Sequence, residues 1–316
     1  MGEWSRRIGE VGEEIVGEFL DLIGWGNSQQ GLTLPCMMGP RHGTASASRH
    51  THGIDYFFSY ASELSNRTLH HLVISVKYSD DPYPGNPSSK FKEHFYDLAK
   101  AIECFRRSEI KRLASREFYG VDDSKDIGVL FWLTNSQSNE NASDSILLRV
   151  DASRSLEKFN YGTIYLVENS RVSFIYDVMK YLAREQPTAD LEFFYPQTGK
   201  NYNSIDSISS GKVLPVEFIN SRVLPLKLSN KKYESKTFVL ATIDEFDVDC
   251  LKRLMGLAHT LSSNLASNVM ILFPDFDRLH HENDVRSAKS SFRDNDFVSD
   301  VRVSSYRANF RNLSNE

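Results

Sequence analysis

The chain has 316 residues, 40% of them hydrophobic and 25% charged, with a formal net charge of −5. A chain of this length can bury a full core and predicts two domains, and its composition is that of an ordinary soluble globular protein. No run approaches the roughly 18 apolar residues of a membrane-spanning helix, so no membrane contact is expected. The negative charge excludes a general basic field for nucleic acid, and any such contact must come from a local patch.

The N-terminus and the cysteines predict a cytoplasmic protein. The first residues, MGEWSRRIGEVGEE, are charged and lack the apolar segment of a signal peptide. Cys36, Cys104 and Cys250 are odd in number and far apart in sequence, which fits reduced thiols in a cytosol.

Apolar periodicity predicts an N-terminal domain over residues 1–190, in which a mixed central sheet is flanked by helices. The glycines inside the first helix suggest close packing against a strand, a backbone or a phosphate. The predicted elements are a helix over Arg6–Ile23, a polar loop over 26–51, strands between His52 and Ser79, one long helix from Ser88 or Ser89 to Glu117, a strand over 127–133, a short strand or turn at 146–150, a strand over 163–167 and a helix over 172–183.

Clusters of Pro, Gly, Ser and Asn in residues 184–231 place a domain boundary there, at residue 190. A second α/β domain, residues 191–316, is expected to serve substrate or partner binding. Its predicted elements are strands over 213–218, 223–228 and 238–243, a helix over 247–265, a strand over 269–273, a helix near 276–290 and a strand around 298–304.

Four side chains of the first domain suit phosphodiester chemistry. Side chains alternate along a strand, so Ser75 and Lys77 project from one face, and Asp55 projects beside them from the neighbouring strand. Glu13 could add a second carboxylate from the helix. Magnesium is held by one or two carboxylates with waters and the phosphate, so Asp55 is the expected principal ligand. Lys77 would orient the attacking water and offset developing negative charge.

These residues resemble the signature of the PD-(D/E)xK, or restriction-endonuclease-like, nucleases, and look most like the Holliday-junction resolvase and Mrr-like branches. The matching pieces are Gly9-x-x-Gly12-Glu13-x-x-Val16, Gly53-Ile54-Asp55 and Ser75-Val76-Lys77. The resemblance covers roughly residues 5–185. It implies a restriction-endonuclease-like core and Mg²⁺-dependent hydrolysis of DNA, with Mn²⁺ able to substitute. The implied metal ligands are Asp55, Glu13 and the backbone carbonyl of Val76.

Ser75 departs from the family pattern, which usually has Glu, Asp or Gln at this position. A hydroxyl is a neutral and weaker metal ligand. Three outcomes stay open: Glu13 compensates and one metal suffices, the enzyme is slow, or the fold is inactive and only binds nucleic acid. Glu10 and Glu14 are rivals of Glu13, because a charged helix face is usually just solvated.

Basic residues in two places are candidates for nucleic-acid contacts. Arg41 and Arg49 lie in the loop before the first strand, and His52, near Asp55, could reach a phosphate. The long helix has a basic face that could follow a DNA backbone, although such faces are more often solvated. The candidates on this face are Arg106, Arg107 and Lys111.

A zinc site is not expected from the sequence. Cys36, His42, His50 and His52 follow one another in the sequence, but this series lacks the paired Cys-x2-Cys spacing of structural zinc sites.

The sequence thus predicts a Mg²⁺-dependent DNA endonuclease, with bacterial defence against phage or foreign DNA as its role by analogy. The expected partners are DNA and a companion defence protein. A homodimer or hetero-oligomer is expected, because one site cuts one strand and two-fold symmetry supplies the second. The alternatives are an inactive nuclease fold that binds nucleic acid or scaffolds a complex, and a non-nuclease interaction protein in which Glu13, Asp55 and Lys77 do not converge.

Overall fold

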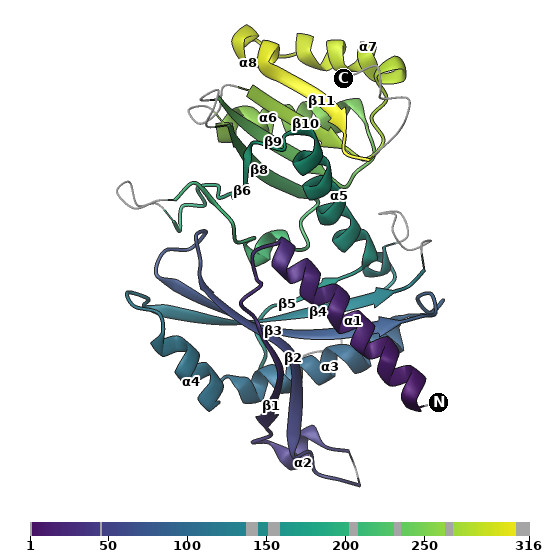
Figure 1. The fold of residues 1–316 in the computed structure, drawn as a ribbon, viewed down its shortest axis with the longest axis vertical. Coiled ribbons are helices and arrows are strands. Elements are labelled where there is room, and N and C mark those ends of the chain that lie inside the picture. The colour runs from purple at the N-terminus through teal and green to yellow at the C-terminus, as the bar shows by residue number, and fades with distance from the viewer. Residues whose placement is uncertain are drawn as a thin grey trace. The chain divides into compact units, whose positions relative to one another are not determined.

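Two mixed β-sheets, each with its own helices, make up the structure, which is a computed structural model (Figure 1). It describes residues 2–44, 46–136, 145–150, 159–201, 208–230, 235–262 and 268–307. One unit comprises residues 1–172 and 198–204, and the other comprises residues 173–197 and 205–316. A functional boundary at residue 190 stays a prediction. Among the described helices, none combines the length and apolarity needed to span a membrane.

The sheet of the first unit has the strand order β1-β2-β3-β4-β5. Strands β1, β2 and β3 pair antiparallel, and β3, β4 and β5 pair parallel, so the predicted mixed sheet is confirmed. The strands are β1 (Gln29–Pro35), β2 (Thr51–Ala61), β3 (Thr68–Ser79), β4 (Asp123–Thr134) and β5 (Ile164–Val167).

Helices cover both faces of this sheet. Phe131 of β4 packs edge-on against Phe19 of α1 (Gly2–Leu22), with ring centroids 5.9 Å apart. The neighbours of Phe131, Leu130 and Trp132, belong instead to the core formed with α3 (Ser88–Phe105). Because adjacent strand residues point to opposite faces, α1 and α3 lie on opposite sides of the sheet. Burial on both faces explains why β4 is a nearly continuous apolar run.

Two predictions for the first unit were wrong. Residues 26–51 are not only loop, since they contain β1 and the short helix α2 (Gly39–His42). The alternating polar residues of β1 hide it, because it is an edge strand with few buried side chains. The expected long helix is broken after Phe105, and a second helix, α4 (Glu109–Arg116), begins after Ser108. The Ser108 hydroxyl accepts a hydrogen bond from the N–H of Lys111 and caps this new helix.

Smaller differences concern side-chain burial, and of the two alternatives at 146–150 the turn is the one observed. On α1, Val11 and Ile15 are exposed although their spacing predicts burial, and Val16 is buried instead. Leu113 of α4 is also exposed. The short strand or turn expected at 146–150 contains a 3₁₀ turn (Ile146–Leu148).

The sheet of the second unit has the strand order β11-β10-β9-β8-β6-β7. Its core places α6 (Val248–Ser262) and α7 (Arg278–Ser290) against one face, which Val303 of β11 joins. Ser304, the next residue, contacts Tyr181 of α5 (Asn169–Glu185), so α5 covers the opposite face. The strands are β6 (Asp190–Phe194), β7 (Ser210–Gly211), β8 (Val223–Asn230), β9 (Ser235–Thr242), β10 (Asn268–Phe273) and β11 (Val301–Ser305).

The α/β class of this unit is confirmed, with three corrections. Strands β6 and β7 were not predicted. The strand expected over 213–218 is a 3₁₀ turn at Val216–Phe218, which follows a proline. Residues 298–300 belong to the helix α8 (Asn295–Asp300), which Asp294 caps by accepting a hydrogen bond from the N–H of Phe297. The last residues of the helix expected over 247–265 lie outside the described residues.

Candidate active site

Strands β2 and β3 separate next to Asp55. Their pairing runs from Ala61–Leu69 to Tyr56–Ile74 and stops there, while β3 continues to pair with β4 as far as Ser79. Beyond the last pair, a carboxylate oxygen of Asp55 accepts a hydrogen bond of 2.6 Å from the backbone N–H of Val76. We call this opening between Asp55 and Val76 the strand fork.

A local twist of β2 turns Asp55 toward the fork. Ile54 and Phe57 both belong to the core on the α3 side, although strict alternation would place residues three apart on opposite faces. The twist therefore lies at Asp55 and Tyr56. In β1, Gly31 sits opposite this point with φ of +65°, a left-handed conformation that glycine adopts without steric cost.

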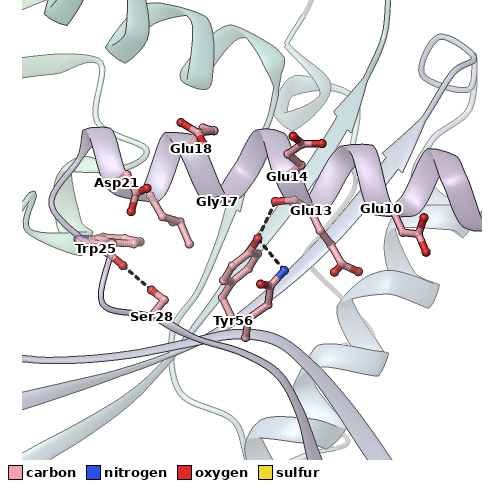
Figure 2. Close-up of a pocket in the computed structure, with 12 residues that line it drawn as sticks. Glu10, Glu13, Glu14, Gly17, Glu18, Asp21, Trp25, Ser28 and Tyr56 are labelled. Carbon is pink, nitrogen blue, oxygen red and sulfur yellow. Dashed lines mark hydrogen bonds between the residues drawn. The ribbon is translucent and has the colours of Figure 1, made fainter.

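Glycines in α1 bring the helix close to the fork. A Cβ on Gly12 would lie 2.3 Å from Cβ of Tyr78 on β3, so only glycine allows this approach. The prediction that a helix glycine packs closely against a strand is confirmed at this position. The hydroxyl of Tyr56 donates a 2.7 Å hydrogen bond to the backbone carbonyl of Glu13, which fixes this turn of the helix to β2 (Figure 2).

Glu13 is the carboxylate of α1 that faces the strand fork. Burial raises its pKa, and the negative charge of Asp55 raises it further, while Lys77 acts in the opposite direction. Glu13, Asp55 and Lys77 therefore lie within electrostatic range of one another, as the nuclease hypothesis requires. Glu10 instead forms an exposed ion pair with Arg6 at 2.9 Å, and Glu14 is exposed.

The backbone of Val76 adds an oxygen to this group. The N–H and C=O of one strand residue point to the same edge of the strand, and the N–H of Val76 bonds Asp55. Its carbonyl therefore faces the same fork. Two carboxylates and a carbonyl are oxygen ligands of the kind that Mg²⁺ prefers. Burial raises the pKa of Glu13 most and the negative charge of Asp55 raises it further, and a divalent cation between the two carboxylates would offset both effects.

Ser75 cannot replace the missing carboxylate. Its side chain is buried, with 8% exposure, and alternation places it on the face of Val73, which packs in the α3 core. The hydroxyl is neutral and has no charge to offer a cation.

Lys77 stands where two open cavities meet. One cavity, of about 580 Å³, lies beside Gly9, Val76 and Trp132. The other, of about 560 Å³, lies beside Arg49 and the basic and acidic side chains of α3. A Cβ on Gly9 would meet nothing within 4 Å, so the helix leaves room beside the fork. A nucleic-acid backbone could approach Lys77 from this side.

A third cavity, of about 430 Å³, lies along α1 and contains most of its carboxylates (Figure 2). Glu13 borders it, but Asp55 and Lys77 do not. Its acidic lining repels phosphate groups, which argues against nucleic-acid binding in this cavity. The acidic residues that line it are Glu10, Glu13, Glu14, Glu18 and Asp21.

His94 is a residue of this site that the sequence did not indicate. It borders both cavities beside Lys77 and packs edge-on against Trp132. Burial, together with Lys90 and Lys77, lowers its pKa to about 4, so the imidazole is neutral at pH 7. The only signal in the sequence is its helical spacing from Phe91 and Leu98, which predicts the same face of α3.

The predicted nucleic-acid residues lie in different places. Arg49 reaches the Lys77 cavity and pairs with Asp97 at 2.6 Å. Arg41 is half-exposed and pairs with Glu103 at 3.2 Å. Arg106 and Lys111 both pair with the buried Asp126, and Arg107 is exposed. Two of the three basic side chains predicted on the long helix thus form ion pairs within the protein.

His52 does not reach the solvent. Its side chain is 1% exposed, and its Nε2 lies 3.3 Å from Nδ1 of His42. The prediction that His52 contacts a phosphate was wrong, because the strand turns this side chain into the core toward Cys36 and Cys104.

Comparison with known proteins gives one match. The model of a family described as the GAPS4 protein PD-(D/E)XK nuclease domain matches residues 1–171, which is more than half of the chain. The matched range includes the whole strand fork and every strand of the first sheet. No curated protein and no solved structure gives a match to this chain.

Proposed function

Since the chain belongs to the family of GAPS4 PD-(D/E)XK nuclease domains, we propose that the strand fork is the active site of a Mg²⁺-dependent DNA endonuclease, with Mn²⁺ able to replace Mg²⁺. The observation that supports this most is that the charges of Asp55 and Lys77 both act on Glu13, while Asp55 is bonded to the backbone N–H of Val76. These groups come from a helix and two strands that are far apart in sequence.

Asp55, Glu13 and the carbonyl of Val76 would hold the metal ion. When bound, the ion supplies charge to the scissile phosphate and lowers the pKa of water. The hydrogen bond from Val76 to Asp55 fixes the carboxylate, so its orientation costs no reorganisation at the moment of reaction. Lys77 follows Val76 in β3 and would place its ammonium group beside the phosphate, where negative charge develops.

Ser75 predicts a weak metal site. The family position that usually supplies a carboxylate is here a buried hydroxyl, so Glu13 is the second acidic ligand. Two carboxylates match the charge of one divalent ion and leave none for a second. We therefore expect activity with a single ion, at a Mg²⁺ requirement higher than that of a site with three carboxylates.

Positive side chains near Lys77 would bind the DNA backbone. Arg49 and Lys100 border one cavity, and Lys90 borders the other. Such contacts give affinity without sequence recognition and weaken as the salt concentration rises. His94 is neutral at pH 7 and would donate a hydrogen bond to phosphate without adding charge.

The test is cleavage of plasmid and single-stranded DNA with Mg²⁺ or Mn²⁺. Asp55→Asn and Lys77→Met are each expected to reduce the cleavage rate at least about 100-fold. The matched controls are Asp123→Asn and Lys125→Met, exposed positions on β4 opposite the far end of β3, which should retain full activity. Cleavage that survives both site substitutions would show that the strand fork is not the active site. DNA binding without cleavage in either ion would favour the inactive binding protein.

The biological role is proposed on the family description and by analogy. A nuclease of this kind would act in the cytoplasm in bacterial defence against phage or foreign DNA, with a companion protein. Cleavage of both strands of a duplex requires two sites, which a homodimer or a hetero-oligomer would supply. The second unit has a sheet and core of its own outside the matched range, and we assign it to substrate or partner binding. Plaque assays with and without the companion gene, and the mass of the purified assembly, test these points.

A further inference from the structure

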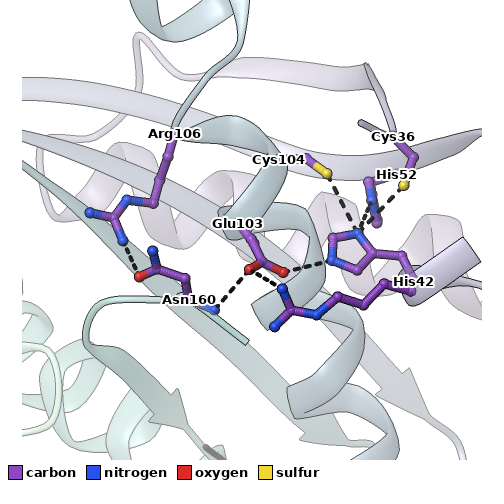
Figure 3. Close-up of polar contacts among 8 residues, drawn as sticks. Cys36, His42, His52, Glu103, Cys104, Arg106 and Asn160 are labelled. Atoms are coloured by element: carbon purple, nitrogen blue, oxygen red, sulfur yellow. Dashed lines mark hydrogen bonds and ion pairs between the residues drawn. The ribbon is translucent and has the colours of Figure 1, made fainter. Parts of the chain in front are cut away.

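Four side chains with nitrogen and sulfur donors meet in the core of the first unit (Figure 3). Cys36 follows β1, His42 ends α2, His52 lies in β2 and Cys104 lies near the end of α3. One donor atom from each residue lies within 4.8 Å of every other. We call these residues the Cys/His cluster.

The three distances from His42 to the other members of the Cys/His cluster are those of ligands around one ion. Nδ1 of His42 lies 3.4 Å from Sγ of Cys36, 3.5 Å from Sγ of Cys104 and 3.3 Å from Nε2 of His52. A tetrahedron with zinc–ligand bonds of about 2.0–2.3 Å has edges of roughly 3.3–3.8 Å. One nitrogen lone pair cannot accept hydrogen bonds from three neighbours, whereas a cation at the centre would satisfy all four donors.

Glu103 orients His42 as a ligand. Nε2 of His42 lies 2.8 Å from one carboxylate oxygen of Glu103. The other oxygen of Glu103 pairs with Arg41 and accepts a hydrogen bond from the backbone N–H of Asn160 (Figure 3). A carboxylate at this nitrogen holds the proton there and leaves Nδ1 free to bind a metal. Zinc-ligating histidines usually have such a carboxylate, carbonyl or water partner. The backbone N–H groups of Met37 and Met38 donate to the Cys104 sulfur.

The burial and the charge of the Cys/His cluster favour Zn²⁺ as its ion. His42, His52 and Cys104 are at most 1% exposed, and Cys36 is half-buried. Two thiolates cancel the charge of a divalent cation and two imidazoles stay neutral, so the complete site carries no net charge into the core. Nitrogen and sulfur donors suit Zn²⁺ and not Mg²⁺. Four protein ligands leave no open position, which is typical of a structural zinc site.

We propose that Cys36, His42, His52 and Cys104 bind one structural zinc ion. Binding forms two Zn–S and two Zn–N bonds and releases the two thiol protons to solvent. The ion joins β1, α2, β2 and α3, and it fixes β2 three residues before Asp55. The sequence hid this site because the second cysteine comes from α3, far along the chain from residues 36–52, which hold the other three ligands.

The first test is the metal content of the purified full-length chain by elemental mass spectrometry. We expect about one zinc per chain after growth with added zinc. Cys104→Ser and His42→Ala should each lose it, and their unfolding temperature should fall by several degrees. The matched controls Cys250→Ser and His50→Ala, which lie outside the Cys/His cluster, should keep it. Zinc retained by both cluster variants, or lost in a control, would overturn the proposal.

A second measurement uses the unmodified protein and stays informative if the variants do not fold. Cys36 and Cys104 should resist alkylation until a strong chelator removes zinc, while Cys250 should react equally with and without the chelator. Alkylation of all three cysteines regardless of chelator rules out the zinc site. A mass deficit of two hydrogens, with no metal bound, would replace the zinc site with a Cys36–Cys104 disulfide.

The substitution Glu103→Gln tests the role of the Glu103 carboxylate independently of the four metal ligands. This variant keeps all four donors and the side-chain size, and we expect its zinc affinity to fall about 10–100-fold in a chelator competition. An unchanged affinity would show that Glu103 does not position His42 for a metal and would contradict the proposed geometry.

Discussion

Two groups of potential metal ligands each include one residue of β2, and these two residues, His52 and Asp55, are three positions apart. The two groups differ in their ligand atoms, their charge and their burial. Asp55 belongs to the strand fork, where the ligands are oxygens, half-exposed and negatively charged. His52 belongs to the Cys/His cluster, where the ligands are nitrogen and sulfur, mostly buried and complete in number. One strand therefore presents an open site and a closed one.

The difference follows from local packing. At the strand fork, β2 and β3 stop pairing, so backbone and carboxylate oxygens are left without strand partners and are partly exposed to solvent. In the Cys/His cluster, β1, α2 and α3 close around the donors and leave no position for a substrate. A closed site next to an open one can hold the strand rigid where the chemistry requires an accurate position.

The largest expected effect comes from substituting one ligand in each site and measuring the properties of both sites in each variant. Asp55→Asn should remove the increase in unfolding temperature that Mg²⁺ produces and reduce cleavage at least about 100-fold, while the zinc content stays unchanged. Cys104→Ser should lose zinc. Thermal unfolding with and without Mg²⁺, combined with metal analysis, measures both. Loss of zinc in Asp55→Asn would show that the two sites are not independent.

Gly12→Ala should disturb the strand fork through the helix. Its Cβ would lie 2.3 Å from Cβ of Tyr78, so α1 must move away and take Glu13 with it. We expect a loss of about 1–3 kcal/mol of unfolding free energy, with reduced cleavage. Gly9→Ala is the control, because the added Cβ meets nothing within 4 Å. Alanine is more favourable than glycine inside a helix by about 1 kcal/mol, so this variant should not lose stability. Equal effects of the two substitutions would contradict the close approach at Gly12.

Ser75→Glu should strengthen metal binding at the strand fork, because it restores the carboxylate that the family usually has. If metal affinity limits activity, the Mg²⁺ concentration for half-maximal cleavage should fall about tenfold, which corresponds to about 1.4 kcal/mol. Ser75→Ala is the control and should change this concentration little, since the buried hydroxyl is not a ligand. A large loss in Ser75→Ala would instead make the hydroxyl part of the metal site.

The smallest effect is a pH dependence of the protein without metal. Burial and Asp55 raise the pKa of Glu13 above its ordinary 4.5, so the folded chain takes up this proton at a higher pH than the unfolded chain. The stability contributed by Glu13 therefore rises as the pH falls through the raised pKa, and the affinity for Mg²⁺ falls over the same range. Glu13→Gln should remove both trends in thermal unfolding with and without Mg²⁺. A stability contribution of Glu13 that decreases as the pH is lowered would contradict the sign that we assign.

The sequence was informative where local rules act alone. Apolar spacing predicted α1, α3, β3 and β4, because burial on one stripe or on both faces leaves a period that can be counted. The motifs around Glu13, Asp55 and Lys77 led to the prediction that these residues converge, and the charges of Asp55 and Lys77 do act on Glu13. It failed where a short polar element depends on its neighbours: β1 is an edge strand, and the break at Ser108 is made by a single capping hydroxyl.

The sequence by itself thus determined the α/β class, since alternation and helical period can be counted along the chain, and its resemblance to nuclease motifs singled out Asp55 and Lys77 as candidates. Only the tertiary structure decided that Glu13 rather than Glu10 faces Asp55, because this depends on how closely Gly12 lets α1 approach β3. It also decided that Cys104 joins Cys36, His42 and His52. Contacts between distant segments follow from the packing of whole elements, and no spacing along the chain records them.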